Sequence, residues 1–174
     1  MTVLIFILLA VMPALVITAG LKDLLTMKIP NWISISLALA FFPAALATGL
    51  PLQDILVHVG LAVAVLIIGM LIFALRWLGG GDVKLMAALC LWLGLSTSGL
   101  FAVYTALVGG LFGLGLLLAR RKVGPFLPPS LHPSLAWVSA LMEPKGDIPY
   151  GIAIAIGALL AYPSSPMIQA ALAR

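Results

Sequence analysis

Two acidic residues, far apart in the chain, are the side chains best suited to chemistry in this 174-residue sequence. Asp23 follows a long apolar run, and Asp82 follows the glycine triplet 79–81. A carboxylate at membrane depth is costly, so such groups usually face a cavity and mark function. If the two approach to a few ångströms, both cannot ionise comfortably, and one proton is shared. One carboxyl group then takes a proton from water while the other donates to a peptide bond, which is aspartyl proteolysis without metal or cofactor.

The composition requires lipid as the solvent for the elements that carry these acids. Hydrophobic residues make up 64% of the chain and charged residues only 8%, against about 25% charged residues in soluble domains. Six spans of about 20 residues each would use most of the chain. We therefore expect an all-α, polytopic integral membrane protein of about six transmembrane helices, with residues 1–174 forming a single membrane-embedded domain.

Apolar runs interrupted by glycine, proline and charge predict where the spans lie. The predicted spans are 2–21, 32–49, 54–75, 83–96, 99–119 and 148–162. We expect the first span to be retained rather than cleaved as a signal peptide, because no basic residue precedes it and two lysines follow it. The proline-rich connection before the last span excludes one continuous helix, but Ser134 to Met142 predicts a short interfacial helix capped by Ser134.

The basic residues are scattered beside apolar runs, which suits membrane orientation rather than binding to nucleic acid. Eight of the nine fall in connections that share one face. They are Lys22, Lys28, Arg76, Lys84, Arg120, Arg121, Lys122 and Lys145. Because short basic loops stay in the cytoplasm, both termini are expected outside it, and both acids on its side of the inner membrane.

Three short motifs support a resemblance to a known family. Gly79-Gly80-Gly81-Asp82 reads as the Gly-x-Gly-Asp motif of polytopic aspartyl proteases, and Val83-Lys84-Leu85 follows it. Ile29-Pro30-Asn31 comes soon after Asp23, and Ile148-Pro149-Tyr150-Gly151 opens the last predicted span. In motif order, spacing and expected topology, the whole chain resembles the type IV prepilin peptidase family.

The resemblance implies that Asp23 and Asp82 form a catalytic dyad with no metal or cofactor. It implies prepilin and pseudopilin substrates whose short basic leader is cut after a glycine in the cytoplasm. Gly79, Gly80 and Gly81, with Pro149, Tyr150 and Gly151, are expected to bind the substrate.

Longer family members carry a cysteine-rich cytoplasmic portion linked to N-methylation, and the segment from Gly20 to Trp32 has no room for it. We therefore expect no soluble methyltransferase-type domain. This brevity resembles the stand-alone peptidases of tight-adherence, Flp-type pilus systems, with archaeal preflagellin peptidases as close relatives. The sequence does not distinguish between those substrates, and it does not determine the oligomeric state.

Structural explanations compete with these functional ones. Without a catalytic role, Asp82 would be an acid that caps the start of a helix, and Asp23 would be a solvated acid beside Lys22. Asp147 is interpreted as a helix cap. For Lys84 the favoured interpretation is a side chain that reaches the interface rather than one that tunes the dyad. Two rival functions are a small proton-coupled transporter, which needs acids reachable from both faces, and a noncatalytic scaffold of pilus assembly.

Other conspicuous residues favour packing over chemistry. Asp54 and His58, four apart, are expected to pair on one helix face at the opposite end from the dyad rather than to bind metal. Cys90 is the only cysteine, which excludes an internal disulfide and a Cys-x-x-Cys zinc site. Gly109-x-x-x-Gly113 is a close-packing pattern that fits contact within the monomer as well as dimerisation.

Overall fold

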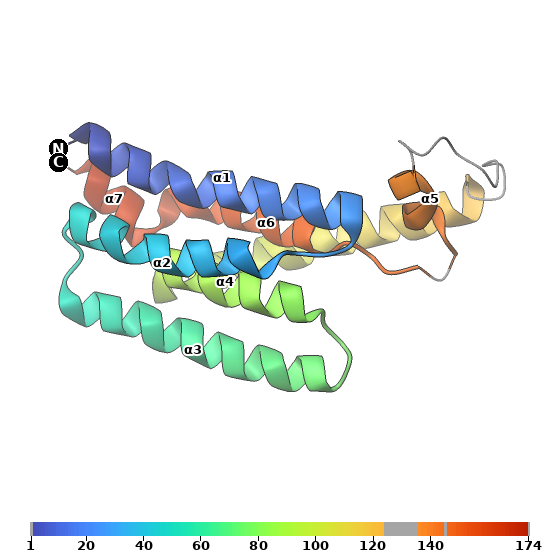
Figure 1. The fold of residues 1–174 in the computed structure, drawn as a ribbon, viewed down its shortest axis with the longest axis horizontal. Helices are drawn as coiled ribbons and strands as arrows, with labels where there is room; N and C mark the ends of the chain where they lie inside the picture. The colour runs from blue at the N-terminus through green and yellow to red at the C-terminus, as the bar shows by residue number, and fades with distance from the viewer. Residues whose placement is uncertain (1, 124–135, 145, 174) are drawn as a thin grey trace.

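A computed structural model describes residues 2–123, 136–144 and 146–173, which are helical with short connections and include no strand (Figure 1). The helices are α1 (Thr2–Thr26), α2 (Asn31–Thr48), α3 (Leu52–Ala74), α4 (Gly80–Lys122), α5 (Ala136–Met142), α6 (Gly151–Ala161), the 3-10 helix η3 (Tyr162–Ser164) and α7 (Pro166–Leu172). This confirms the predicted all-α class. The short helix α5 is the later part of the helix expected from Ser134, which itself lies outside the described residues.

The chain reverses direction inside α4. Its 43 residues would extend about 65 Å as one straight helix, about twice the hydrocarbon thickness of a bilayer. Gly94 interrupts the helix with φ 69° and ψ 175°, angles open essentially to glycine alone, and the two arms run in opposite directions (Figure 1). The turn expected at 96–99 was therefore misplaced, because residues there are helical.

Three contacts explain why the reversal occurs at Gly94. A side chain at this position would collide with the ring of His58, which occupies the space beside it. The hydroxyl of Ser98 donates to the Gly94 carbonyl at 2.7 Å, and that of Thr97 donates to the carbonyl of Ser164 at 3.0 Å. The hydrogen bonds of the two hydroxyls stabilise the break and join it to the end of η3.

Four helices in the described chain, α1 to α4, are long and apolar enough to cross a membrane, and α6 with α7 adds a fifth if the bent pair is one span. Counting the two arms of α4 separately gives six passes within the described residues, one for each predicted apolar run. Both ends of the chain consequently lie at the same end of the bundle (Figure 1). The structure is that of a polytopic helical membrane protein.

Two helix boundaries near the acids differ from the predicted ones. Helix α1 continues to Thr26, so Asp23 lies on the helix rather than in a loop after it. Helix α6 begins at Gly151, later than the expected 148. Pro149 keeps Ile148 out of the helix, because a proline disfavours helical backbone angles in the residue before it.

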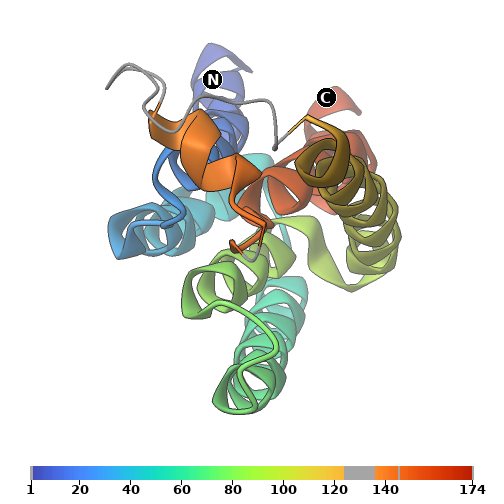
Figure 2. The same cartoon turned by 90° about the vertical axis from the view of Figure 1, so that its right-hand side faces the viewer.

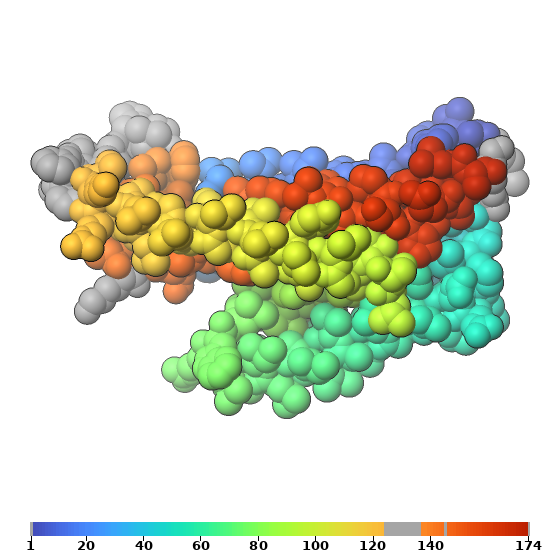
Figure 3. Space-filling model, turned by 180° about the vertical axis from the view of Figure 1, so that it is seen from behind, coloured from blue at the N-terminus to red at the C-terminus, as the bar shows by residue number. Residues whose placement is uncertain are grey.

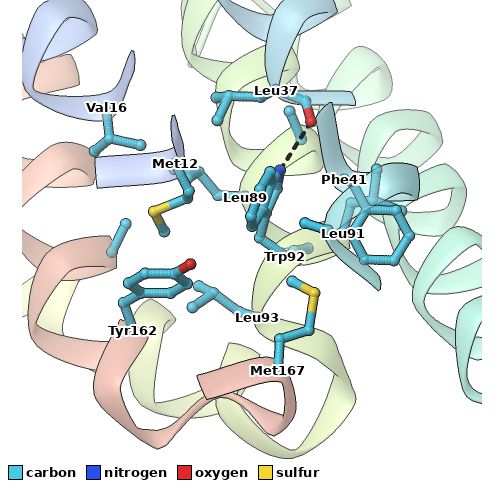
Figure 4. Packing of buried hydrophobic residues seen from close by; sticks show 14 of the residues in the cluster. Met12, Val16, Leu37, Phe41, Leu89, Leu91, Trp92, Leu93, Tyr162 and Met167 are labelled. Carbon is cyan, nitrogen blue, oxygen red and sulfur yellow. Dashed lines mark hydrogen bonds between the residues drawn. The ribbon is translucent and has the colours of Figure 1, made fainter. Parts of the chain in front are cut away.

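The core is centred on Trp92, in the first arm of α4 (Figure 4). Its indole N–H donates to the carbonyl of Leu37 in α2 at 2.8 Å. Tyr162 packs nearby, and its hydroxyl donates to the carbonyl of Leu9 in α1 at 2.8 Å. Since lipid is as apolar as these side chains, close packing and interhelical hydrogen bonds, rather than removal from water, hold the helices together.

Helix α3 lies at the edge of the bundle and packs mainly on α4 (Figure 2). Only Ile55, His58 and Gly69 of this helix are buried. An added Cβ at Gly69 would lie 2.5 Å from a methyl group of Val83, so glycine permits the close approach of α3 to the start of α4. This contact sets the position of the α3–α4 turn, which borders the site described next.

Candidate active site

The structure brings the two acids that the sequence paired to one cavity. Asp23 lies near the end of α1 and Asp82 in the first turn of α4, and both line a cavity of about 1070 Å³. The carboxyl groups are close enough for the charge of Asp23 to act on Asp82. Asp23 is only 6% exposed. The structure thus places two acids, remote in sequence, along one cavity.

Each carboxyl group accepts a hydrogen bond from the backbone at the start of a helix. The N–H of Gly151, the first residue of α6, donates to Oδ2 of Asp23 at 2.7 Å. The N–H of Gly79, the N-cap of α4, donates to Asp82. Helix N-termini favour negative charge, and hydrogen bonds to a carboxylate are stronger than neutral ones. The two carboxyl groups are therefore held in defined orientations.

The glycine triplet 79–81 provides space rather than unusual backbone angles. None of the three has a positive φ, and α4 begins within the triplet at Gly80. A Cβ at Gly79 would lie 2.7 Å from Oδ2 of Asp82, and one at Gly81 would lie 3.1 Å from Cβ of Ile29. Side chains at these positions would thus displace Asp82 or the residues that follow α1.

Of the six residues expected to bind substrate, Gly79, Pro149 and Tyr150 line the cavity. Gly80 and Gly81 pack behind it in the first turn of α4. Gly151 is buried against Asp23, where an added Cβ would lie 2.8 Å from Oδ2. Within the Pro149-Tyr150-Gly151 segment, the first two residues therefore lie along the cavity and the third packs against Asp23.

The glycines of the second arm of α4 pack within the monomer at two positions. Gly109 lies under the ring of Tyr150, which a side chain at that position would strike. A Cβ at Gly113 would lie 3.8 Å from Cδ1 of Ile148, whereas Gly110 has nothing within 4 Å. The Gly109-x-x-x-Gly113 pattern therefore serves the contact between α4 and the segment that precedes α6.

Among the other residues that border the cavity are two charged side chains and one indole that the sequence did not assign to substrate binding. Arg76, whose φ is 60°, and the exposed Trp77 lie in the α3–α4 turn. Asp147 is exposed and also lines the cavity, and its predicted capping role is wrong because Tyr150 is the N-cap of α6. Figure 3 shows the green α3–α4 turn projecting away from the yellow and orange part of the molecule. The only signal in the sequence that pointed to Asp147 was its position in a connection on the same face as the basic residues.

Lys84 does not line this cavity. Its side chain is exposed, and its ammonium group donates to Oδ1 of Asn31 at the start of α2, at 2.9 Å. The favoured interpretation, in which Lys84 does not tune the dyad, agrees with this placement.

The Asp54 and His58 pair lies away from the cavity and is organised differently from the expectation. His58 is 4% exposed, and its Nδ1 lies 2.7 Å from the carbonyl of Leu91. Because a carbonyl only accepts, this nitrogen carries the proton and donates to Leu91 rather than pairing with Asp54. The His58 ring also stacks on Phe41 with ring centroids 5.7 Å apart. Across the described ranges, no group of three or more histidine, cysteine or acidic side chains is placed to hold a metal ion.

Comparison with known proteins agrees with the motifs. The model of the type IV leader peptidase family matches residues 10–114, which is more than half of the chain and includes both acids and the glycine triplet. Searches of curated proteins and of solved structures gave no match. The family match implies protease activity, and the apolar helices place that activity in a membrane protein. On its sequence match and its polytopic helical fold, this chain belongs to the type IV leader peptidase family.

Proposed function

We propose that this protein is an aspartic endopeptidase that removes the basic leader from type IV-like, Flp-type prepilins and pseudopilins at the cytoplasmic face of the inner membrane, for pilus biogenesis. The observation that carries the proposal is the meeting of Asp23 and Asp82 in one cavity, although 59 positions separate them. Membership of the leader peptidase family supports the same reaction class.

The dyad acts with one shared proton. The ionised carboxyl group removes a proton from water, and the water oxygen attacks the carbonyl carbon of the scissile bond. The protonated carboxyl group hydrogen-bonds the carbonyl oxygen and then supplies the proton that the leaving amine needs. The C–N bond breaks, and water has been divided between the new acid and the new amine. The backbone N–H groups of Gly79 and Gly151 hold the two carboxyl groups in place for this sequence.

The cavity suits a peptide that enters from the basic end of the molecule. Gly79, Pro149 and Tyr150 line it and are proposed to contact the extended leader junction, while Gly80, Gly81 and Gly151 act by close packing behind the acids. The exposed carboxylate of Asp147 offers a basic leader an opposite charge. The mature, apolar part of the substrate would remain in lipid.

The placement of the acids favours a peptidase over a proton-coupled transporter. A transporter needs acids that are reached alternately from both faces of the membrane. Asp23 and Asp82 line the same cavity at one end of the bundle, the end away from the chain termini. A noncatalytic scaffold would require neither acid.

The experiment is to change Asp23→Asn and Asp82→Asn separately and to co-express each with an epitope-tagged Flp-type prepilin. We expect each variant to leave the prepilin at its precursor size on an immunoblot, because asparagine can neither share the proton nor act as a base. Asp54→Asn is the matched control, since Asp54 is exposed and lies away from the cavity. Normal processing by either well-expressed variant would reject this dyad. Cleavage of an archaeal preflagellin but not of the prepilin would reject the Flp-type assignment alone.

A further inference from the structure

Arg120 is a buried cation in the last turn of α4. Only 7% of the residue is exposed. A buried charge is strongly unfavourable unless its hydrogen-bonding groups are satisfied. The guanidinium satisfies them with backbone carbonyls. Its Nε donates to Leu141 at 2.7 Å, and its two terminal nitrogens donate to Gly146 and Asp147 at 2.8 Å each.

Two of the three carbonyls belong to the segment that forms one wall of the cavity, and the third belongs to α5. Leu141 lies in the last turn of α5, where helix carbonyls lack partners within the helix. Gly146 and Asp147 begin the stretch 146–150, which lines the cavity beside the acids. The next residue, Gly151, donates its N–H to Asp23. A continuous set of contacts therefore runs from the guanidinium to a carboxyl group of the dyad.

Membrane orientation alone does not account for this side chain. Arg121 and Lys122 are exposed at the same end of α4 and supply positive charge there. Arg120 instead uses the planar, forked geometry of its donors to reach three carbonyls, which the single ammonium group of a lysine does not reproduce.

We propose that Arg120 is a positioning residue for the peptidase, which fixes the backbone at Leu141, Gly146 and Asp147 and thereby holds the cavity wall and the Gly151 N–H against Asp23. This inference rests on the proposed function for its catalytic consequence, but not for its structural one. Loss of the three hydrogen bonds frees the wall, and a carboxyl group displaced by about 1 Å lowers turnover by about a hundredfold.

The structural consequence is tested by cysteine labelling, which needs no peptidase activity. Leu141→Cys in a Cys90→Ala background places a single thiol at a buried position whose carbonyl still accepts from Arg120. We expect slow reaction with a maleimide in membrane vesicles. Adding Arg120→Lys or Arg120→Ala should accelerate labelling severalfold, whereas Arg121→Ala should leave it unchanged.

The catalytic consequence is measured with the native Cys90 and Leu141 in place. We expect Arg120→Lys to lower kcat for a prepilin reporter by about ten- to hundredfold, with a smaller change in KM and an unchanged helical circular dichroism spectrum. If Arg120→Ala does not fold, Arg120→Lys decides both measurements. Unchanged labelling, or faster labelling with unchanged kcat, would overturn the positioning role. Failure of the dyad itself would appear instead as processing by the Asp23→Asn or Asp82→Asn variant, with the labelling result unaffected.

Discussion

Replacing Gly151 by alanine tests whether the orientation of Asp23 determines activity. In the structure Gly151 is buried and its N–H donates to Oδ2 of Asp23. An alanine Cβ would lie 2.8 Å from this oxygen and 2.8 Å from Cδ1 of Ile29. The methyl group leaves the backbone N–H in place, so the substitution changes the geometry of the hydrogen bond rather than removing its donor.

The size of the effect follows from the distance that must be recovered. Ordinary van der Waals contact begins near 3.4 Å, so Asp23 or the start of α6 must move by about 0.6 Å. A displacement of about 1 Å at a catalytic group costs about a hundredfold in rate. We therefore expect Gly151→Ala to lower kcat/KM by at least about tenfold, equivalent to about 1.4 kcal/mol of transition-state stabilisation. The overpacking cost of about 1–3 kcal/mol is partly offset by the higher helix propensity of alanine, so the protein should still fold.

The assay is cleavage of a purified, tagged prepilin by the purified peptidase in lipid vesicles, followed over time by gel mobility. Gly110→Ala is the matched control, because this glycine lies in α4 and an added Cβ meets nothing within 4 Å. It should retain full activity and gain up to about 1 kcal/mol of stability. A folded Gly151→Ala enzyme with the kcat/KM of the parent would refute the argument that this contact sets the position of Asp23.

Two further predictions concern the fold. Gly94→Ala should destabilise the protein by more than about 2 kcal/mol, because it combines a positive φ of 69° with a collision against His58. Thermal unfolding in detergent measures this loss. Adding His58→Ala should recover only the part of the loss that the collision causes, so full recovery would contradict a backbone contribution. Trp92→Phe should lower the melting temperature by an amount equivalent to about 1 kcal/mol, because it removes the hydrogen bond to the Leu37 carbonyl and leaves a void. Trp77→Phe, at an exposed position, is the control. Equal effects of the two substitutions would exclude a specific role for Trp92.

The candidate site was predictable where it depends on residue type. An intramembrane carboxylate is unusual enough to be conspicuous, and the triplet before Asp82 supplied a motif. The hydrogen bonds from Gly79 and Gly151 were not predictable, because every residue except proline offers the same backbone N–H. Arg120 was assigned to membrane orientation for a similar reason, since its partners are three carbonyls that leave no trace in the amino-acid pattern.

The helix pattern shows the same division. Hydropathy located the apolar segments, but the reversal expected among the polar residues 96–99 occurs at Gly94 instead. Serine and threonine are tolerated within membrane helices because their hydroxyls bond to backbone carbonyls, as Ser98 does. The turn is placed by the contact of Gly94 with His58, a residue of another helix.

The sequence by itself determined that the chain is a helical membrane protein, that its basic connections share one face, and that Asp23 and Asp82 belong to the same end. These properties follow from hydropathy and charge, which are local and additive along the chain. The tertiary structure alone decided where α4 turns, which backbone groups hold the two acids, and how Arg120 supports the cavity wall. Those features depend on the distance between groups that are remote in sequence, and that distance is set by the packing of the whole bundle.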